Sequence, residues 1–188
     1  MSMHPIQPGT QPADPPCRRD QRRQALGTAA ALALGLCLPS AARAALATGR
    51  PAPDFTLRSG EGRNLRLAEQ RGQVVMVNFW ATWCTPCRVE MPHLQRLHEQ
   101  YRSAGFLLLG VSVDDDPAKA MELARRLQVS FPILFDTDKA VSRLYDLRTM
   151  PSTMLIDRDG ALRQVHRGYR EGVEQLYAQQ VRSLLKEA

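Results

Sequence analysis

The sequence predicts an α/β fold in which a mixed β-sheet is flanked by helices on both faces. Two continuous apolar stretches, QVVMVNFWA at 73–81 and GFLLLGVSVD at 105–114, have the composition of fully buried strands. Apolar residues at helical spacing follow each stretch, which is typical of parallel strands joined by helical crossovers. Near the end of the chain, Asp159-Gly160 stands between two strand-like runs and indicates an antiparallel hairpin.

Local patterns predict the other elements in chain order. A first hairpin is expected where DFTLR at 54–58 and NLRL at 64–67 alternate apolar and polar residues around SGEG. From Cys84 to Tyr101 the apolar spacing is helical. Pro132 disfavours a central place for its strand, because proline cannot donate to a sheet ladder. The remaining predicted elements are a helix, a short edge strand, a short helix, the second hairpin and a closing amphipathic helix, at 117–129, 131–136, 138–147, 152–168 and 172–188.

The first 44 residues are predicted to be an export signal with a disordered N-terminal extension, ahead of a folded domain at 45–188. A polar, Pro-rich opening leads to the basic RRDQRR at 18–23, an apolar stretch at 24–39 and a small-residue cleavage signal, with cleavage expected after Ala44. The apolar stretch is shorter than the about 20 residues of a transmembrane helix. We therefore expect a protein of the periplasm.

The export route stays open at this point. Arg22-Arg23 loosely matches a twin-arginine signal, and an ordinary Sec signal fits equally well. Cys37 follows apolar residues as a lipid-accepting cysteine does, but Leu36 stands where such a signal has a small residue. Lipidation or an uncleaved anchor is thus the less favoured reading.

The charge balance gives no support to a nucleic-acid partner. The net charge is +6, but five of the 25 basic and two of the 19 acidic residues precede residue 45, which leaves +3 for the mature chain. The remaining basic residues are scattered along the sequence. We expect a monomer that binds no nucleic acid.

Cys84 and Cys87 are the only cysteines left once the leader, with Cys17 and Cys37, is removed. One pair does not make a disulfide framework, and a chain of about 144 residues can bury a sufficient core without one. We therefore expect the pair to have a chemical role and not to serve as a structural disulfide.

The placement of the pair predicts thiol–disulfide exchange. Cys84 stands between a buried strand and a helix, and a helix N-terminus lowers a thiol pKa from about 8.5 to roughly 3.5–7.5. Cys87 follows one turn later on nearly the same face, and Pro86 suits the first helical turn. We expect an exposed Cys84 to attack a substrate disulfide and Cys87 to resolve the mixed disulfide.

Two further residues are candidates at this site. Glu90, one turn past Cys87, is the candidate proton acceptor for a buried thiol that resists ionising, although a solvated helix acid would have the same spacing. Trp83 falls in the connection before the helix and is expected to offer a surface to a partner, whereas Trp80 packs in the core.

Metal binding is the rival use of a cysteine pair. Structural zinc needs four ligands; no second cysteine pair exists, and His93 and His98 lack the ligand spacing and are expected on the helix surface. Cu(I) needs only two thiolates, so copper delivery remains open. We expect no bound metal and no cofactor.

The stretch VNFWATWCTPCRVEMP at 77–92 resembles the thioredoxin superfamily, and most closely its exported TlpA/ResA-like thiol–disulfide oxidoreductases. GRPAPDFTL at 49–57 resembles the opening that this family shares with peroxiredoxins, and TMPSTMLIDRDG at 149–160 resembles the segment that carries the family's cis-proline. The resemblance covers about residues 49–186. It implies a thioredoxin-like mixed β-sheet with an N-terminal β-hairpin and a central insertion at about 114–135.

The resemblance also implies roles for single residues. Pro151, with Met150 before it, would form a cis peptide bond beside the cysteine pair and guide the substrate backbone. The family is similar to this chain in having an acid where Glu90 stands, which favours the proton-acceptor role. The expected substrate-binding residues are Trp83, Thr85, Pro86, Met150 and Pro151.

At two places the sequence departs from the motifs of related families, which narrows the class of protein. Cytosolic thioredoxins carry a buried Asp where this chain has Asn78, which cannot take a proton. Peroxiredoxins place a Pro and a Thr or Ser where this chain has Val77 and Ala81, so peroxidase activity is not expected.

The prediction is an exported thiol–disulfide oxidoreductase that reduces protein disulfides through Cys84 and Cys87. The resemblance suggests apocytochrome c, in cytochrome c biogenesis, or copper-site proteins as substrates, and a membrane electron donor of the thiol-reductase type. The direction of electron flow does not follow from the sequence. A disulfide oxidase or isomerase with the same site, and a Cu(I)-delivery protein, remain alternatives.

Overall fold

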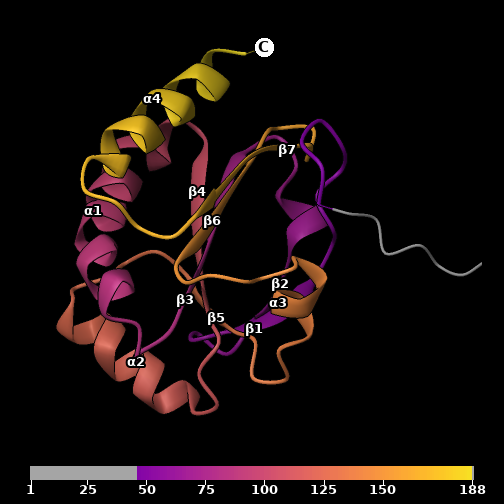
Figure 1. Cartoon of the computed structure of the whole chain (residues 1–188). Helices are drawn as coiled ribbons and strands as arrows, with labels where there is room; N and C mark the ends of the chain where they lie inside the picture. Colours follow the sequence, from indigo (N-terminus) through magenta and orange to yellow (C-terminus); the bar gives the residue numbers. More distant parts are fainter. Residues whose placement is uncertain (1–45, 188) are drawn as a thin grey trace, which may run out of the picture. The chain divides into compact units, whose positions relative to one another are not determined.

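The computed structural model describes residues 46–187, which form a seven-stranded mixed sheet with helices on both faces (Figure 1). This is the predicted α/β fold class. The predicted export signal at 1–44 lies outside the described residues, so its cleavage and export route stay predictions. No helix in the described part of the chain is long and apolar enough to cross a membrane.

The sheet has the strand order β2-β1-β5-β4-β3-β6-β7, with β3, β4 and β5 parallel and the remaining pairs antiparallel. Central β3 is buried at every position, as expected for a strand that is covered on both faces. The strands are β1 (Thr56–Ser59), β2 (Asn64–Arg66), β3 (Val74–Trp80), β4 (Phe106–Ser112), β5 (Ile133–Phe135), β6 (Ser152–Ile156) and β7 (Leu162–Arg167).

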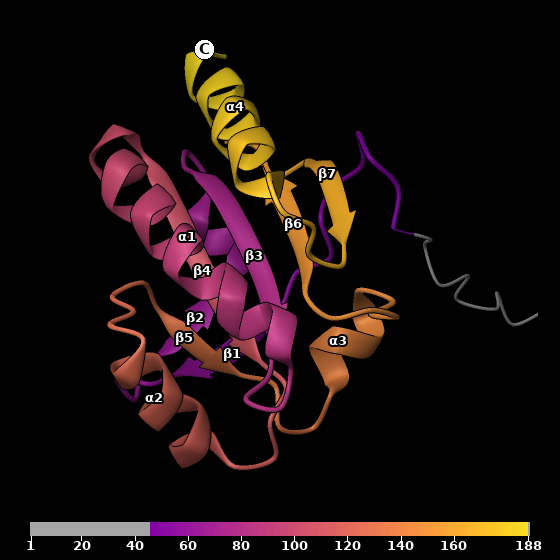
Figure 2. The same ribbon diagram turned by 60° about the vertical axis from the view of Figure 1, so that its left-hand side comes forward.

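The helices cover the two faces of the sheet unequally. Figures 1 and 2 show α1, α2 and α4 on one side and α3 on the other. Pro86 and Pro117 stand in the first turns of α1 and α2, where the missing N–H has no helical partner to lose. The helices are α1 (Thr85–Tyr101), α2 (Pro117–Arg126), α3 (Ala140–Leu144) and α4 (Val173–Lys186), with 3-10 turns at Leu67–Gln70 and Arg102–Ala104.

The N-terminal hairpin and the central insertion are both present. β1 and β2 pair antiparallel, and the insertion between β4 and β5 contains α2. The expected edge position of the strand after Pro132 was wrong, because β5 pairs with β4 on one side and with β1 on the other. Pro132 lies just ahead of β5, where only its carbonyl is used, to accept from the N–H of Gly110.

Helix α4 packs its apolar stripe against the sheet and α1. Tyr177, Val181 and Leu184 are buried, as their helical spacing predicts. Leu176 of the same predicted pattern is exposed, because it lies toward the solvent side of the stripe. The packing directs the Tyr177 ring into the interior, toward the middle of β3.

The segment 49–55, here called the strap, ties the two edges of the sheet together. At its start Gly49 donates to the carbonyl of Leu162, and Pro51 forms a bridge with Ala161 beside the β6–β7 turn. At its end the carbonyl of Phe55 accepts from Leu67, next to the β1–β2 hairpin. The strap thus crosses from one edge of the sheet to the other before β1 begins.

Candidate active site

Cys84 is the N-cap of α1, at the point where the chain turns from β3 into the helix. Its N–H donates to the carbonyl of Ala81 over 3.2 Å, which closes the turn. The N–H of Cys87 in the first turn of the helix lies 3.2 Å from the Cys84 Sγ and donates to it. A thiolate at Cys84 would therefore meet a free helical N–H and the positive end of the helix dipole.

Cys84 and Cys87 form a disulfide, with the two sulfurs 2.07 Å apart; this is the bond that the predicted resolution of the mixed disulfide by Cys87 leaves behind. Cys87 has no exposed surface, and Cys84 retains 5%. The expectation of an exposed Cys84 was therefore wrong for this state, in which Cys84 is buried and its sulfur is bonded to the fully buried Cys87. Cys84 is nevertheless the more accessible residue of the pair, as expected for the cysteine that exchanges with a partner.

Pro151 joins the site from the start of β6, the strand that pairs with β3. The Met150–Pro151 peptide bond is cis, which confirms that prediction. Its neighbour Ser152 pairs with Phe79 near the end of β3, and the Pro151 carbonyl accepts from Gly168 over 2.7 Å. The cis-proline loop therefore lies at the same end of β3 as the cysteine turn.

The predicted substrate-contact residues differ in exposure. The Trp83 side chain is one of the most exposed large apolar groups in the described chain, with 68% of its surface accessible. Thr85 and Pro86 are also exposed, Met150 is half-buried and Pro151 is buried. The structure places Trp83, Thr85 and Pro86 around Cys84, and their contact with a substrate stays a prediction.

Glu90 is a buried carboxyl in the second turn of α1, 1% exposed. Its Oε2 accepts from the Asn78 side-chain amide of β3 over 2.9 Å, and its Oε1 accepts from the Tyr177 hydroxyl of α4 over 2.9 Å. Asn78 also donates to the Thr153 hydroxyl of β6 over 2.9 Å. Three elements thus meet at this carboxyl, which is no solvated helix acid.

Burial raises the pKa of Glu90 to about 7, while the hydrogen bonds from Asn78 and Tyr177 lower it in part. Burial, and then the Glu90 charge, also raises the pKa of Tyr177, so its hydroxyl remains a donor. A carboxyl that titrates near neutrality, one helical turn beyond Cys87, can take a proton from a thiol at physiological pH.

Tyr177 and Thr153 are site residues that the sequence did not reveal. Tyr177 fits the apolar stripe of α4 and was predicted to be a core residue, which it also is. Thr153 is a polar residue inside the buried strand β6 and was not predicted to belong to the site. The sequence drew attention to Asn78 only because its side chain cannot titrate. In the structure its amide donates a hydrogen bond to Glu90. A polar residue inside a buried strand was the one available signal.

The histidines of the described chain lie apart from one another in different surroundings. His98 was expected on the helix surface, which was wrong, because its ring packs edge-on against Phe131 of the insertion and is buried there; burial lowers its pKa. His93 is partly exposed and lies beside Arg96 and Glu174. Within residues 46–187, no group of three or more metal-ligating side chains comes together.

Comparisons with known proteins agree with this geometry. The AhpC/TSA family model matches residues 48–165. The chain is 38% identical over 126 residues to thiol-disulfide oxidoreductase ResA of Geobacillus thermodenitrificans, covering 67% of this chain and 72% of that protein. It is 31% identical over 128 residues to ResA of Bacillus subtilis, covering 68% and 72%. A solved structure described as thiol:disulfide interchange protein DsbE from Chlorobium tepidum has a TM-score of 0.72 and 34% identity, covering 74% of this chain and 99% of that one.

The fold, the paired cysteines and these relatives together define a thioredoxin-like thiol–disulfide oxidoreductase, an enzyme of a class that acts on protein thiols and disulfides. The chain belongs to the AhpC/TSA family, and within it resembles the oxidoreductases named ResA.

Replacing Glu90 by Gln tests the raised pKa through protein stability. A folded pKa of about 7 lies above the ordinary value of 4.5, so between these values the folded protein binds the proton more tightly than the unfolded chain. The free energy of unfolding therefore falls as pH rises. At 1.36 kcal/mol per pKa unit, the Glu90 share is about 2–3 kcal/mol between pH 5 and pH 8.

Urea unfolding of the oxidised protein at these two pH values measures this share as the difference between wild type and Glu90→Gln. Other titrating groups cancel in that difference. A difference below about 1 kcal/mol would show that Glu90 titrates near its ordinary pKa.

Replacing Tyr177 by Phe is expected to move the Glu90 pKa upward. The tyrosine hydroxyl donates to the carboxylate and favours its charged form, so its removal leaves burial less opposed. NMR titration of the carboxyl carbon measures the pKa. Tyr145→Phe is the matched control, because that buried hydroxyl donates to the carbonyl of Pro53, on the other face of the sheet. A pKa that stays in place or falls in Tyr177→Phe contradicts the assignment.

Proposed function

We propose that this protein is an exported reductant of protein disulfides in the periplasm. The observation that carries the proposal is the buried Glu90, held by Asn78 and Tyr177 one turn beyond Cys87, with a pKa near 7. The basic and apolar segments before residue 44 support export. The likeness to the oxidoreductases named ResA supports the class of reaction.

The first step is attack by the Cys84 thiolate on one sulfur of a substrate disulfide. The substrate S–S bond breaks, a bond forms between Cys84 and the attacked sulfur, and the other substrate sulfur leaves as a thiolate that takes a proton from water. The Cys87 N–H, which lies 3.2 Å from the Cys84 Sγ, stabilises the attacking anion. Exposed Trp83 offers apolar surface to the substrate beside the reacting sulfur.

The second step releases the reduced substrate. The Glu90 carboxylate accepts the proton of the Cys87 thiol, directly or through water, and the Cys87 sulfur attacks Cys84. The mixed disulfide breaks, the second substrate sulfur leaves as a thiolate that takes the proton from Glu90, directly or through water, and the protein ends with the Cys84–Cys87 disulfide. Two electrons have then passed to the substrate. A membrane donor of the thiol-reductase type returns two electrons and two protons.

The substrates we propose are apocytochrome c, with its paired haem-binding cysteines, and copper-site proteins whose cysteines must be reduced. Both present a disulfide that blocks the loading of a cofactor or metal. Support for them comes from the resemblance to the TlpA/ResA-like group.

The reduction potential of the Cys84–Cys87 pair tests the direction of electron flow. Full-length protein equilibrated with glutathione buffers is expected to have a potential well below about −240 mV, with each 30 mV worth about 1.4 kcal/mol for two electrons. A value above about −180 mV would instead indicate an oxidase or isomerase. Catalytic reduction of insulin supports turnover, and stoichiometric retention of Cu(I) without insulin reduction would favour copper delivery.

Replacing Glu90 by Gln is also expected to slow release from the mixed disulfide. Gln keeps the shape, and the Asn78 amide can turn its unpaired Oδ1 toward the new donor, so the variant should fold. In wild type the release rate should rise as pH passes about 7, because Glu90 is protonated below it. In the variant the rise is lost, and the rate at pH 8 falls on the order of 100-fold.

The second phase of thionitrobenzoate release from a disulfide dye measures this step, in a background with Cys17→Ser and Cys37→Ser. Glu99→Gln is the matched control, because Glu99 is an exposed acid of the same helix. Equal second phases in wild type and Glu90→Gln near neutral pH would remove Glu90 from the mechanism.

A further inference from the structure

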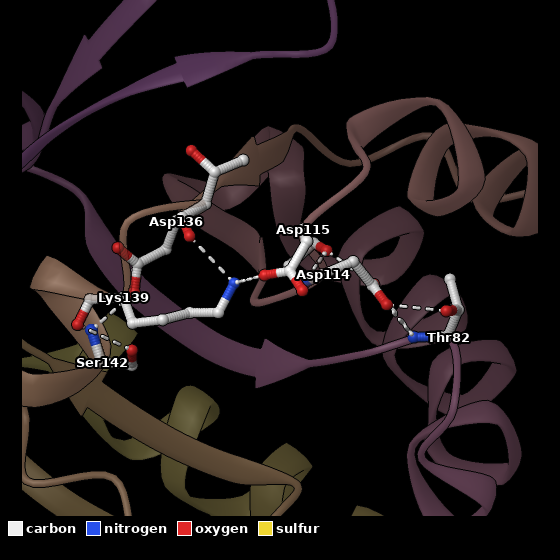
Figure 3. Close-up of polar contacts among 8 residues, drawn as sticks. Thr82, Asp114, Asp115, Asp136, Lys139 and Ser142 are labelled. Atoms are coloured by element: carbon white, nitrogen blue, oxygen red, sulfur yellow. Dashed lines mark hydrogen bonds and ion pairs between the residues drawn. The ribbon is translucent and has the colours of Figure 1, made fainter.

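Asp114 is a buried carboxylate beside the turn that carries Cys84. It lies just past the end of β4, whose last residue, Ser112, pairs with Trp80 at the end of β3. Figure 3 shows its side chain facing the main-chain nitrogen and hydroxyl of Thr82, two residues before the reactive cysteine. The residue that follows β4 thus contacts the turn that follows β3.

Both oxygens of Asp114 are occupied by donors of this region. The Thr82 N–H lies 3.1 and 3.0 Å from the two oxygens, and the Thr82 hydroxyl donates over 2.7 Å. The Ser112 hydroxyl donates to the other oxygen over 2.8 Å and accepts from the Asp114 N–H over 3.1 Å. The neighbouring cation Lys139 pairs with Asp115 instead (Figure 3). Asp114 is therefore bound to the turn by neutral donors.

Holding the turn in this way has two consequences for function. The Cys84 N–H donates to the carbonyl of Ala81, so fixing Thr82 also fixes the direction in which Cys84 enters α1. Trp83, between the fixed residues, points outward with most of its surface exposed. Two hydrogen bonds from Thr82 join Asp114 to the turn and a third, from Ser112, joins it to β4; such bonds to a carboxylate are shorter and stronger than bonds between neutral groups, so they restrict the turn.

We propose that Asp114 is a positioning residue for thiol–disulfide exchange: it clamps Thr82 so that the Cys84 sulfur stays within reach of the Cys87 N–H and Trp83 stays exposed. This inference rests on exchange chemistry at Cys84, and neither on the direction of electron flow nor on the substrate.

A positioning role and a purely electrostatic role of Asp114 predict opposite changes in the pKa of the Cys84 thiol when Asp114 is replaced. If Asp114 clamps the turn, its loss lets the Cys84 sulfur move away from its N–H donor, and the thiol pKa rises toward the free value of about 8.5. If Asp114 acts only as a nearby negative charge, its loss favours the thiolate, and the pKa falls. A merely structural role would change stability and leave the thiol pKa in place.

The test is the pH dependence of Cys84 alkylation by iodoacetamide in the reduced full chain. A Cys87→Ser background keeps the residue-87 N–H, and mass spectrometry of the peptide with Cys84 separates it from Cys17 and Cys37. We expect Asp114→Ala to raise the pKa and to lower the alkylation rate at pH 7 by about tenfold. Asp115→Asn is the matched control, because it removes a charge from the next residue, 94% exposed, without touching Thr82. A Cys84 pKa in Asp114→Ala that equals or lies below the control value overturns the proposal.

A second pair of variants decides the matter if Asp114→Ala fails to fold. Thr82→Val removes only the hydroxyl contact with Asp114, whereas Thr82→Ser can keep it. We expect the Val variant to have a Cys84 pKa higher than the Ser variant, with alkylation at pH 7 slower by about threefold. Equal values for the two variants overturn the clamp. Because alkylation needs no protein substrate, this result is separate from any failure of insulin reduction.

Discussion

The reversal of the chain between β3 and α1 is the constraint on which the site depends. Only residues 81–84 separate the buried strand from the helix, and one backbone hydrogen bond within them, from Cys84 to Ala81, closes the turn. The helix then runs back over the strand that it has just left, so that Glu90 lies above Asn78. The same reversal places the Cys84 sulfur at the N–H groups of the first turn of α1 and buries Cys87 completely. Nucleophile, resolving thiol and acid are thus consequences of one local geometry.

The neutral side chain at position 78 decides how the buried acid behaves. Among the described residues Glu90 has no cation partner, and two neutral donors replace only part of the water that burial removes. An Asp at position 78 would set a second acid against Glu90, and the protons would belong to the pair instead of to one group. The Asn78 amide leaves a single group, whose pKa lies near 7. The buried carboxyl of Asp114, just after β4, lies away from Glu90 at the turn before α1. There it accepts hydrogen bonds from the Thr82 N–H and the Ser112 hydroxyl.

Features encoded in short stretches could be predicted, and features made by distant pairing could not. Cysteine spacing and the helix start are local, and the cis bond before Pro151 followed from a motif resemblance. Tyr177 reaches Glu90 only because α4 packs on α1, and no spacing within either helix encodes that meeting. The interior place of β5 likewise depends on β1, more than 70 residues earlier, returning to pair with it. The burial of His98 and the Asp114 clamp have the same non-local origin.

The strap also determines from which pole of the domain a tether would emerge. Its first residues bind beside the β6–β7 turn, at the end of the sheet where β3 starts, whereas Cys84 follows the end of β3. The seven residues of β3 extend for about 23 Å at roughly 3.3 Å each. The described chain therefore begins at the end of the sheet far from the reactive sulfur. A domain held by that end would turn Trp83 and the cysteine pair away from its attachment, open to partners approaching from the other direction.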